Sequence, residues 1–220
     1  MVWGWIPRNL DTIGQPLAEH LLLSLVPVVA GFLLAVPLGW LANRSATAHA
    51  VLVPAASALY TIPSLAMFVI LPGILGTRIL DPINVIVALT LYTVALLVRS
   101  VADALAAVPA AVVAAAVAMG YRPARRFLSV ELPLSVPVLV AGLRVATVSN
   151  ISLVSVGALI GVGGLGELFT DGLQRGLLIE VLTGIVLTVA LALAADALLL
   201  GAGRSATPWE RAGDVPRTRV

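Results

Sequence analysis

The sequence predicts an all-α polytopic membrane protein with about five transmembrane helices and one helical loop on the cytoplasmic side. Of its 220 residues, 60% are hydrophobic and only 11% are charged. A soluble domain carries about 25% charged residues. The mean hydropathy is +1.08, and several uncharged stretches reach the roughly 20 residues that a spanning helix needs. A soluble enzyme, a disordered chain and a disulfide-stabilised secreted module are therefore disfavoured.

Long gaps between charged residues define the spans. The first contains Pro27, Pro37, Gly31 and Gly39, which indicates a bent and closely packed helix. The others are rich in valine, leucine, isoleucine and alanine. The five expected spans cover about residues 20–42, 52–73, 82–101, 135–161 and 178–202.

One further uncharged stretch, Ala104 to Tyr121, is not expected to span the membrane. It is mostly alanine and contains Pro109. Val113, Val117 and Tyr121 recur at four-residue spacing, as on one face of a helix. Alanine contributes little to insertion, so we expect a helix at the membrane surface or against another protein rather than a span.

Arginine placement suggests an orientation. All 13 basic residues are arginine, and with five spans nine share one side and three the other, with Arg144 inside a span. The arginine-rich side should be cytoplasmic, which puts the N-terminus outside and the C-terminus inside. A sixth span through residues 104–121 would give the same distribution with the N-terminus inside, so this rule alone does not decide. Residues 1–203 form one predicted membrane domain, and the polar residues 204–220 a disordered cytoplasmic tail.

The inventory of reactive side chains is small. There is no cysteine, and the two histidines, His20 and His49, are not spaced as metal ligands, so neither a catalytic nor a metal site is expected. Glu19 and His20 are expected at the membrane interface. The run Gly161 to Gly166 lacks the strand–helix context of a dinucleotide loop. No Walker A sequence is present, so any ATP must be bound by another chain, and a net charge of +2 is too small to suggest nucleic acid.

Polar side chains inside the spans are costly in lipid and tend to face the bundle or a cavity. The residues that we select as a candidate translocation path are Tyr60, Ser64, Ser149, Asn150 and Ser152. The competing interpretation is that these small polar groups form hydrogen bonds between helices.

The most specific pattern lies between Ala114 and Pro133. Its residues are Ala114, Ala115, Ala116 and Gly120, then, after nine residues, Val130, Leu132 and Pro133. This resembles the EAA loop of type I ABC importer permeases, in which Glu-Ala-Ala, three residues and Gly are followed by nine residues and Ile-x-Leu-Pro. Ala114 stands where the family has Glu, and Val130 where it has Ile. The first change removes a carboxylate, so any contact made by that Glu is absent here.

The resemblance extends over about residues 17–200 and points to one branch of the family. Glu19-His20-Leu21, the segment Tyr60 to Ala66, and the segment Gly157 to Gly166 look like the osmoprotectant branch, which imports glycine betaine, choline or carnitine. Other substrates, such as methionine, and a non-transporting accessory membrane protein are the alternatives.

The resemblance implies the partners and the mechanism. Residues 104–133 would form a cytoplasmic coupling loop that docks on an ATPase subunit, so that five spans are expected. A second permease, identical or related, two ATPase subunits that bind ATP and Mg²⁺, and an external solute-binding protein would complete a multi-pass assembly in the bacterial inner membrane. This chain would need no cofactor and would perform no bond chemistry.

Overall fold

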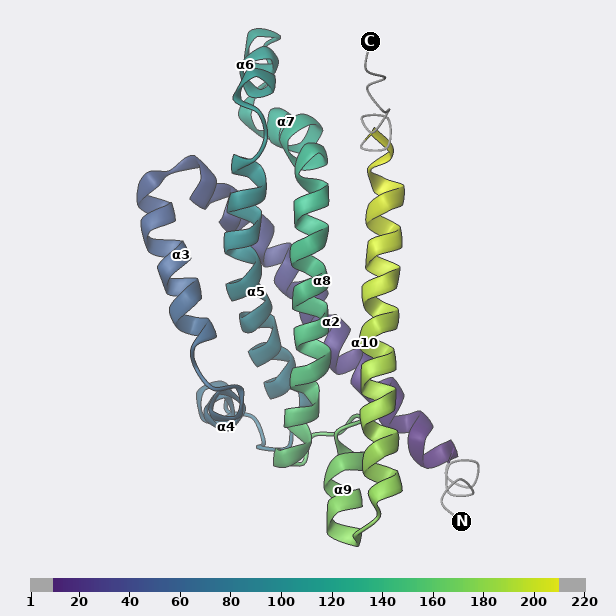
Figure 1. The fold of residues 1–220 in the computed structure, drawn as a ribbon. Helices are drawn as coiled ribbons and strands as arrows, with labels where there is room; N and C mark the ends of the chain where they lie inside the picture. Colours follow the sequence, from purple (N-terminus) through teal and green to yellow (C-terminus); the bar gives the residue numbers. More distant parts are fainter. Residues whose placement is uncertain (1–9, 210–220) are drawn as a thin grey trace.

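The computed structural model describes residues 10–209, which are helical with no strand among them (Figure 1). The main helices are α2 (Leu10–Arg44), α3 (Ala46–Tyr60), α4 (Ser64–Leu75), α5 (Pro82–Ala106), α6 (Ala110–Ala118), α7 (Pro123–Arg126), α8 (Leu132–Gly157), α9 (Glu167–Arg175) and α10 (Leu178–Ala206). A π-helical turn, η2 (Phe127–Glu131), joins α7 to α8, and a 3₁₀ turn, η3 (Ala158–Ile160), follows α8. The end of the predicted tail, residues 210–220, lies outside the described residues.

Four helices are long and apolar enough to cross a membrane, and a bent pair brings the number to five if it counts as one span. The four are Ile13–Arg44, Pro82–Ala106, Pro123–Ile160 and Leu178–Ala206. They coincide with the first, third, fourth and fifth predicted spans. The all-α polytopic fold class is therefore confirmed.

The predicted span over residues 52–73 is present as a bent pair of helices and not as one straight helix. The chain forms α3 and α4 instead, with an angle of 104° between them (Figure 1). The break falls at Thr61–Pro63, because proline has no backbone N–H and disfavours helical geometry in the residue before it. Both helices are apolar, and together they make the fifth candidate span, which is broken between its two halves.

The alanine-rich stretch after α5 does not span, as expected. Helix α6 has 9 residues, about 14 Å at a rise of 1.5 Å per residue. It lies with α7 at one end of the bundle, beside the described C-terminal end of α10, whereas α9 lies at the opposite end (Figure 1).

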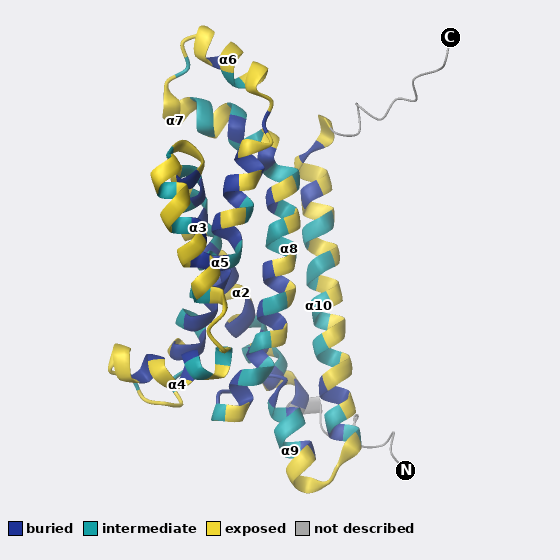
Figure 2. Cartoon of the chain, turned by 60° about the vertical axis from the view of Figure 1, so that its left-hand side comes forward, coloured by how far each residue is buried: buried dark blue, intermediate teal, exposed yellow. Residues whose placement is uncertain are grey.

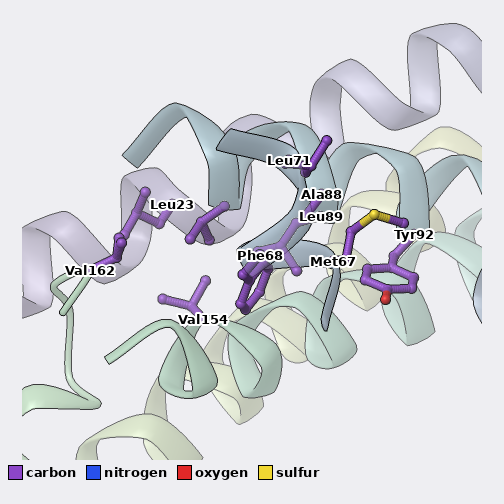
Figure 3. Packing of buried hydrophobic residues seen from close by; sticks show 10 residues of the cluster. Leu23, Met67, Phe68, Leu71, Ala88, Leu89, Tyr92, Val154 and Val162 are labelled. Atoms are coloured by element: carbon purple, nitrogen blue, oxygen red, sulfur yellow. The ribbon is translucent and has the colours of Figure 1, made fainter. Parts of the chain in front are cut away.

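The core lies where α2, α4, α5 and α8 meet. Phe68 and Leu89 are completely buried at its centre, and Tyr92 and Val154 pack around them (Figure 3). Helix α5 is the most enclosed of the spans, whereas α10 is largely exposed (Figure 2). Helix α5 is surrounded by α2, α3 and α8. A displacement at one end of α5 would therefore reach the residues that it contacts in the middle of the bundle.

Candidate coupling segment and translocation path

The predicted coupling loop forms a separate helical segment, here called the coupling segment, which consists of α6, the turn over residues 119–122, α7 and η2. Gly120 ends α6 with a φ of 80°, a left-handed conformation that glycine adopts without strain. The Tyr121 N–H then bonds to the Ala116 carbonyl at 3.1 Å, which closes the helix end. Pro123 opens α7 directly afterwards. A tight turn between two short helices thus follows from these few residues.

The motif residues divide between the two sides of this segment. Ala114, Ala115 and Gly120 are exposed, and Ala116 is buried. Val130, Leu132 and Pro133 are half-buried where the segment joins α8. Apolar side chains also stand exposed on the segment: Val112, Val117, Met119 and Leu128. These exposed apolar side chains lie at the end of the molecule that carries several arginines.

The inner side of the coupling segment is anchored on the spans. Phe127 packs against Trp40 of α2, with ring centroids 5.6 Å apart. Phe127 and Leu132 also contact a buried cluster that includes Val101 and Leu105 of α5. A displacement of the coupling segment would therefore act directly on α2 and α5.

An ion pair inside the coupling segment joins Arg126 to Glu131 across η2. Both side chains are largely buried, which makes this pair part of the segment's internal structure. Arg125 lies over the Tyr121 ring at 5.1 Å, a cation–π contact near the turn. Of the arginines that follow Gly120, two are thus engaged within the segment.

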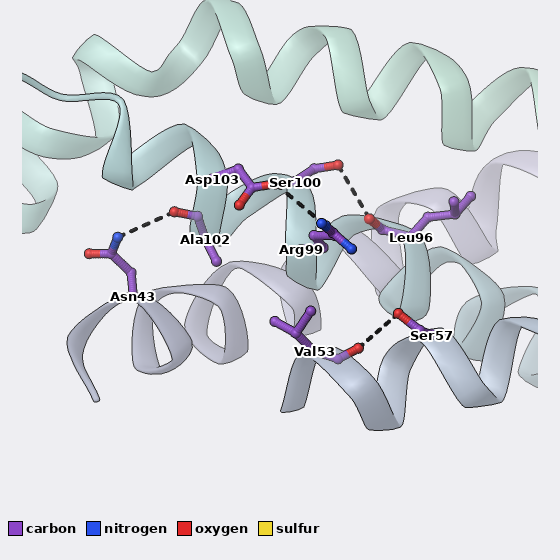
Figure 4. Close-up of polar contacts among 8 residues, drawn as sticks. All are labelled: Asn43, Val53, Ser57, Leu96, Arg99, Ser100, Ala102 and Asp103. Atoms are coloured by element: carbon purple, nitrogen blue, oxygen red, sulfur yellow. Dashed lines mark hydrogen bonds and ion pairs between the residues drawn. The ribbon is translucent and has the colours of Figure 1, made fainter. Parts of the chain in front are cut away.

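The neighbouring ends of α2 and α5 are held by polar contacts (Figure 4). The Asn43 side chain donates to the Ala102 carbonyl at 3.2 Å, which ties the end of α2 to α5. Arg99 and Asp103, one turn apart on α5, form an exposed ion pair at 3.7 Å. The Asn43 bond crosses between helices, so it restrains their ends near the coupling segment, whereas the exposed pair contributes little.

Two of the predicted path residues, Tyr60 and Asn150, contact adjoining residues of α5. Tyr92 stands ten residues after the start of α5, about 15 Å along the helix axis. Its ring meets the Tyr60 ring edge-on at 5.7 Å. On the other side, Asn150 of α8 donates to the Thr93 hydroxyl at 2.9 Å. The adjoining α5 residues therefore place Tyr60 and Asn150 near the middle of α5.

The five path residues differ in exposure. Tyr60 and Ser152 are exposed, and Ser64 and Ser149 are half-buried. Asn150 is buried between α5 and α8, where its bond to Thr93 joins the two helices. Its position matches the hydrogen-bonding interpretation of these polar residues, whereas Tyr60 and Ser152 lie on the surface of the chain.

His20 is not at an exposed interface position; it is completely buried. Its Nε2–H donates to the Ile151 carbonyl at 2.9 Å, and its Nδ1 accepts from the Leu165 N–H at 3.1 Å. A Cβ on Gly164 would lie 3.1 Å from Nδ1, and Gly164 has a φ of 93°. The glycine run thus lets a loop approach α2 closely, a role that sequence spacing alone did not reveal.

Beside this loop, Glu167 begins α9 in an acidic environment. Burial raises the pKa of its carboxyl, and the nearby charges of Glu19 and Asp171 raise it further. Glu19 itself accepts a hydrogen bond from the Gln15 side chain at 3.1 Å. This end of the bundle is therefore acidic, in contrast to the arginine-rich end at the coupling segment.

Arg144 of α8 forms a two-pronged ion pair with Asp196 of α10. Its Nε and Nη2 each lie 2.7 Å from a carboxylate oxygen. The sequence left open whether Arg144 faces a path or reaches toward the membrane surface. In the structure the Arg144 side chain points to α10, where the guanidinium and the Asp196 carboxylate neutralise each other within the membrane-spanning region. Among the described residues, no group of three or more His, Cys, Asp or Glu could hold a metal ion.

Several apolar spans around buried polar contacts, with a short helical segment at one end, define a polytopic membrane protein. The chain belongs to the family of binding-protein-dependent transport system inner membrane components, whose model matches residues 24–202. This is the family of ABC transporter permease subunits, which are not catalytic; a separate subunit is the ATPase.

Individual relatives agree with this assignment. The chain is 32% identical over 190 residues to the choline transport system permease protein OpuBB of Bacillus subtilis, covering 86% of each chain. It is 34% identical over 184 residues to the osmoprotectant import permease protein OsmW of Salmonella typhimurium, covering 82% of this chain and 85% of that one. Among solved structures, an inward-facing MetNI methionine ABC transporter matches with a TM-score of 0.77 at 25% identity, over 89% of this chain and 96% of that chain.

Proposed function

We propose that this permease imports quaternary ammonium osmoprotectants such as glycine betaine, choline or carnitine. The observation that carries the proposal is the similarity, over most of both chains, to relatives named for choline and osmoprotectant transport. The chain would alternate between outward-open and inward-open states, biased by ATP on one side and by the loaded binding protein on the other.

The coupling segment would be cytoplasmic and would dock on an ATPase subunit that holds ATP and Mg²⁺. Ala114, Ala115, Ala116 and Gly120 would form the docking side, and Val130, Leu132 and Pro133 the junction with α8. Exposed apolar side chains beside arginines support this role. The N-terminus would then lie outside and the C-terminus inside, because the described ends of α2 and α10 lie at opposite ends of the bundle (Figure 1).

The complete importer would contain two permeases, two ATPase subunits and an external solute-binding protein. The solute would pass Tyr60, Ser64, Ser149, Asn150 and Ser152 near mid-membrane. The bond between Asn150 and Thr93 suggests that Asn150 supports the path through α5, whereas the accessible Tyr60 and Ser152 would meet the solute.

Methionine is a second candidate substrate, favoured by the structural similarity to the MetNI methionine transporter. Uptake of labelled glycine betaine, choline and methionine by cells with and without the gene, under salt stress, separates the two. We expect gene-dependent uptake of a quaternary ammonium solute. Gene-dependent uptake of methionine alone would contradict the proposed substrate class.

Partner subunits are tested separately. Affinity purification of the tagged permease from its native membrane should retain an ATPase subunit. Replacing Met119 and Val117, the exposed apolar residues of the coupling segment, by serine should release that subunit. A matched double replacement of exposed Val186 and Val189 on α10 should not. Equal loss in both variants would argue against docking at the coupling segment.

A further inference from the structure

The break between α3 and α4 places polar backbone inside the membrane. Residues Thr61, Ile62 and Pro63 are exposed and lie outside both helices. Tyr92 donates its hydroxyl hydrogen to the Ile62 carbonyl at 2.5 Å, and Tyr92 itself stands about 15 Å along α5. Non-helical backbone at such depth is tolerated only where it is buried in protein or lines a water-filled cavity. The exposed side of this break therefore does not face lipid hydrocarbon.

The aromatic ring of Tyr60 lies at the break between α3 and α4. Tyr60 is the last residue of α3 and its side chain is 42% exposed. Its ring meets the Tyr92 ring with an angle of 89° between the ring planes, and Tyr92 is buried in the core. In an edge-on pair of this kind one ring supports the other, which fixes the position of the Tyr60 ring. The ring is thus held at the break instead of moving freely in lipid.

An interfacial anchor is the ordinary role of an exposed tyrosine in a membrane protein. The depth of Tyr60 argues against it. Helix α3 has 15 residues and begins beside Arg44, so Tyr60 lies about 21 Å along it, inside a hydrocarbon core of about 30 Å. Tyr92, which the ring contacts, lies about 15 Å along α5 from the opposite end. Tyr60 is therefore too deep for the aromatic belt at either surface.

A solute with a quaternary ammonium group suits such a ring. This cation cannot donate hydrogen bonds, and the face of an aromatic ring is the group that attracts it without them. No acidic residue occurs between Arg44 and Asp81, so the segment offers no carboxylate that would hold the cation tightly. A single ring gives weak attraction, which is appropriate for a solute that has to leave again.

We propose that the Tyr60 ring contacts the trimethylammonium group of the solute by a cation–π interaction as the solute passes the break between α3 and α4. This inference rests on the proposed function, because it requires that a quaternary ammonium solute is carried. The inference gives Tyr60 a chemical role in transport. It makes Tyr92 the residue that positions the Tyr60 ring.

The test uses the whole importer in proteoliposomes, with permease, ATPase subunits, saturating binding protein and labelled choline. Tyr60→Phe keeps the ring face and should transport at close to the wild-type rate. Tyr60→Leu removes the ring and should lower the transport rate about tenfold, the order expected for a desolvated cation–π contact. Val51→Ala, at another exposed position of α3, is the matched control and should not change the rate.

A second series of variants at position 60 keeps the shape of the aromatic side chain. Phenylalanine with one, two and three fluorine atoms at position 60 weakens the negative ring face stepwise, so the transport rate should fall stepwise. Equal rates across this series, or equal rates for Tyr60→Leu and Tyr60→Phe, would overturn the inference while leaving the proposed function intact. An assembled wild-type importer that moves no quaternary ammonium solute would instead overturn the proposed function and the inference with it.

Discussion

Replacing Gly39 by alanine tests how closely α2 packs against α5. A Cβ built on Gly39 would lie 2.5 Å from the Val101 Cβ and 2.9 Å from the Val98 carbonyl oxygen. Neither atom is the end of a flexible side chain, because one is a Cβ and the other belongs to the backbone. To restore a normal carbon–carbon contact of about 3.5 Å, the two helices would have to move apart by about 1 Å at this crossing.

Two opposing effects determine how much Gly39→Ala changes the free energy of unfolding. In a helix, alanine is favoured over glycine by about 1 kcal/mol. Overpacking a tight contact costs about 1–3 kcal/mol, and the upper end applies because both overlapping atoms are held by the α5 backbone. We therefore expect Gly39→Ala to lower the free energy of unfolding by about 2 kcal/mol, the difference between these effects.

Thermal unfolding of the purified permease in detergent measures this change. At about 2–4 °C per kcal/mol for a chain of this size, Gly39→Ala should lower Tm by about 4–8 °C. Gly201 on α10 is the matched control, because a Cβ there meets nothing within 4 Å. Gly201→Ala should therefore raise Tm slightly. A Tm for Gly39→Ala at or above that of the wild type would refute the close packing of α2 on α5.

Three further predictions concern the coupling segment, the membrane ion pair and the acidic end. Gly120→Val forces a β-branched residue to a φ of 80° and should abolish coupling of ATP hydrolysis to uptake, whereas Gly76→Val, with similar strain at a φ of 68° elsewhere, should retain it. Arg144→Asp should reduce the amount of folded permease in the membrane, and the double variant with Asp196→Arg should recover part of it; no recovery would mean that the two charges are not paired. Because the folded state raises the pKa of Glu167 above its ordinary value of 4.5, this carboxyl contributes stability below pH 4.5 that is lost as pH rises through the raised pKa. Subtracting the stability curve of Glu167→Gln from that of the wild type should show this loss, and a flat difference would contradict it.

Local features of this fold could be predicted from sequence, and contacts between distant residues could not. The apolar runs located the four unbroken spans and the bent pair of α3 and α4, and the spacing of alanines and Gly120 located the coupling segment, because these signals lie within a few turns of helix. Pro63 was visible, yet Pro27 and Pro37 lie inside the continuous helix α2. Proline alone therefore did not indicate which helix would break, since that depends on whether neighbouring helices satisfy the freed backbone groups.

At the candidate site, too, local features could be predicted from sequence and contacts between distant residues could not. Tyr60 and Asn150 were selected for polarity alone, and only the structure separates the exposed ring from the amide that holds Thr93. The contact of His20 with the Leu165 N–H joins residues 145 positions apart, and no periodic pattern encodes such a pairing. The glycine run was a signal for it, because small residues mark a close approach, but the partner could not be read from the run itself.

Helix α5 offers a physical route between the coupling segment and the middle of the membrane. At one end, Val101 and Leu105 belong to the buried cluster that Phe127 contacts. About three turns away, Tyr92 supports the Tyr60 ring, and Thr93 accepts the Asn150 hydrogen bond.

The packing around α5 makes a rigid displacement more plausible than a local deformation. A close-packed interior resists compression, and a Cβ on either Gly31 or Gly39 would overlap α5 side chains, so α2 has no space to move closer to α5. A push on Phe127 should then move α2 and α5 together. The Tyr60 ring would shift with Tyr92, while the exposed helix α10 remains linked to α8 through Arg144 and Asp196. Replacing Asn150 by leucine should therefore weaken coupling without weakening ATPase docking, because it removes the hydrogen bond from α8 to Thr93 of α5 and leaves the coupling segment unchanged.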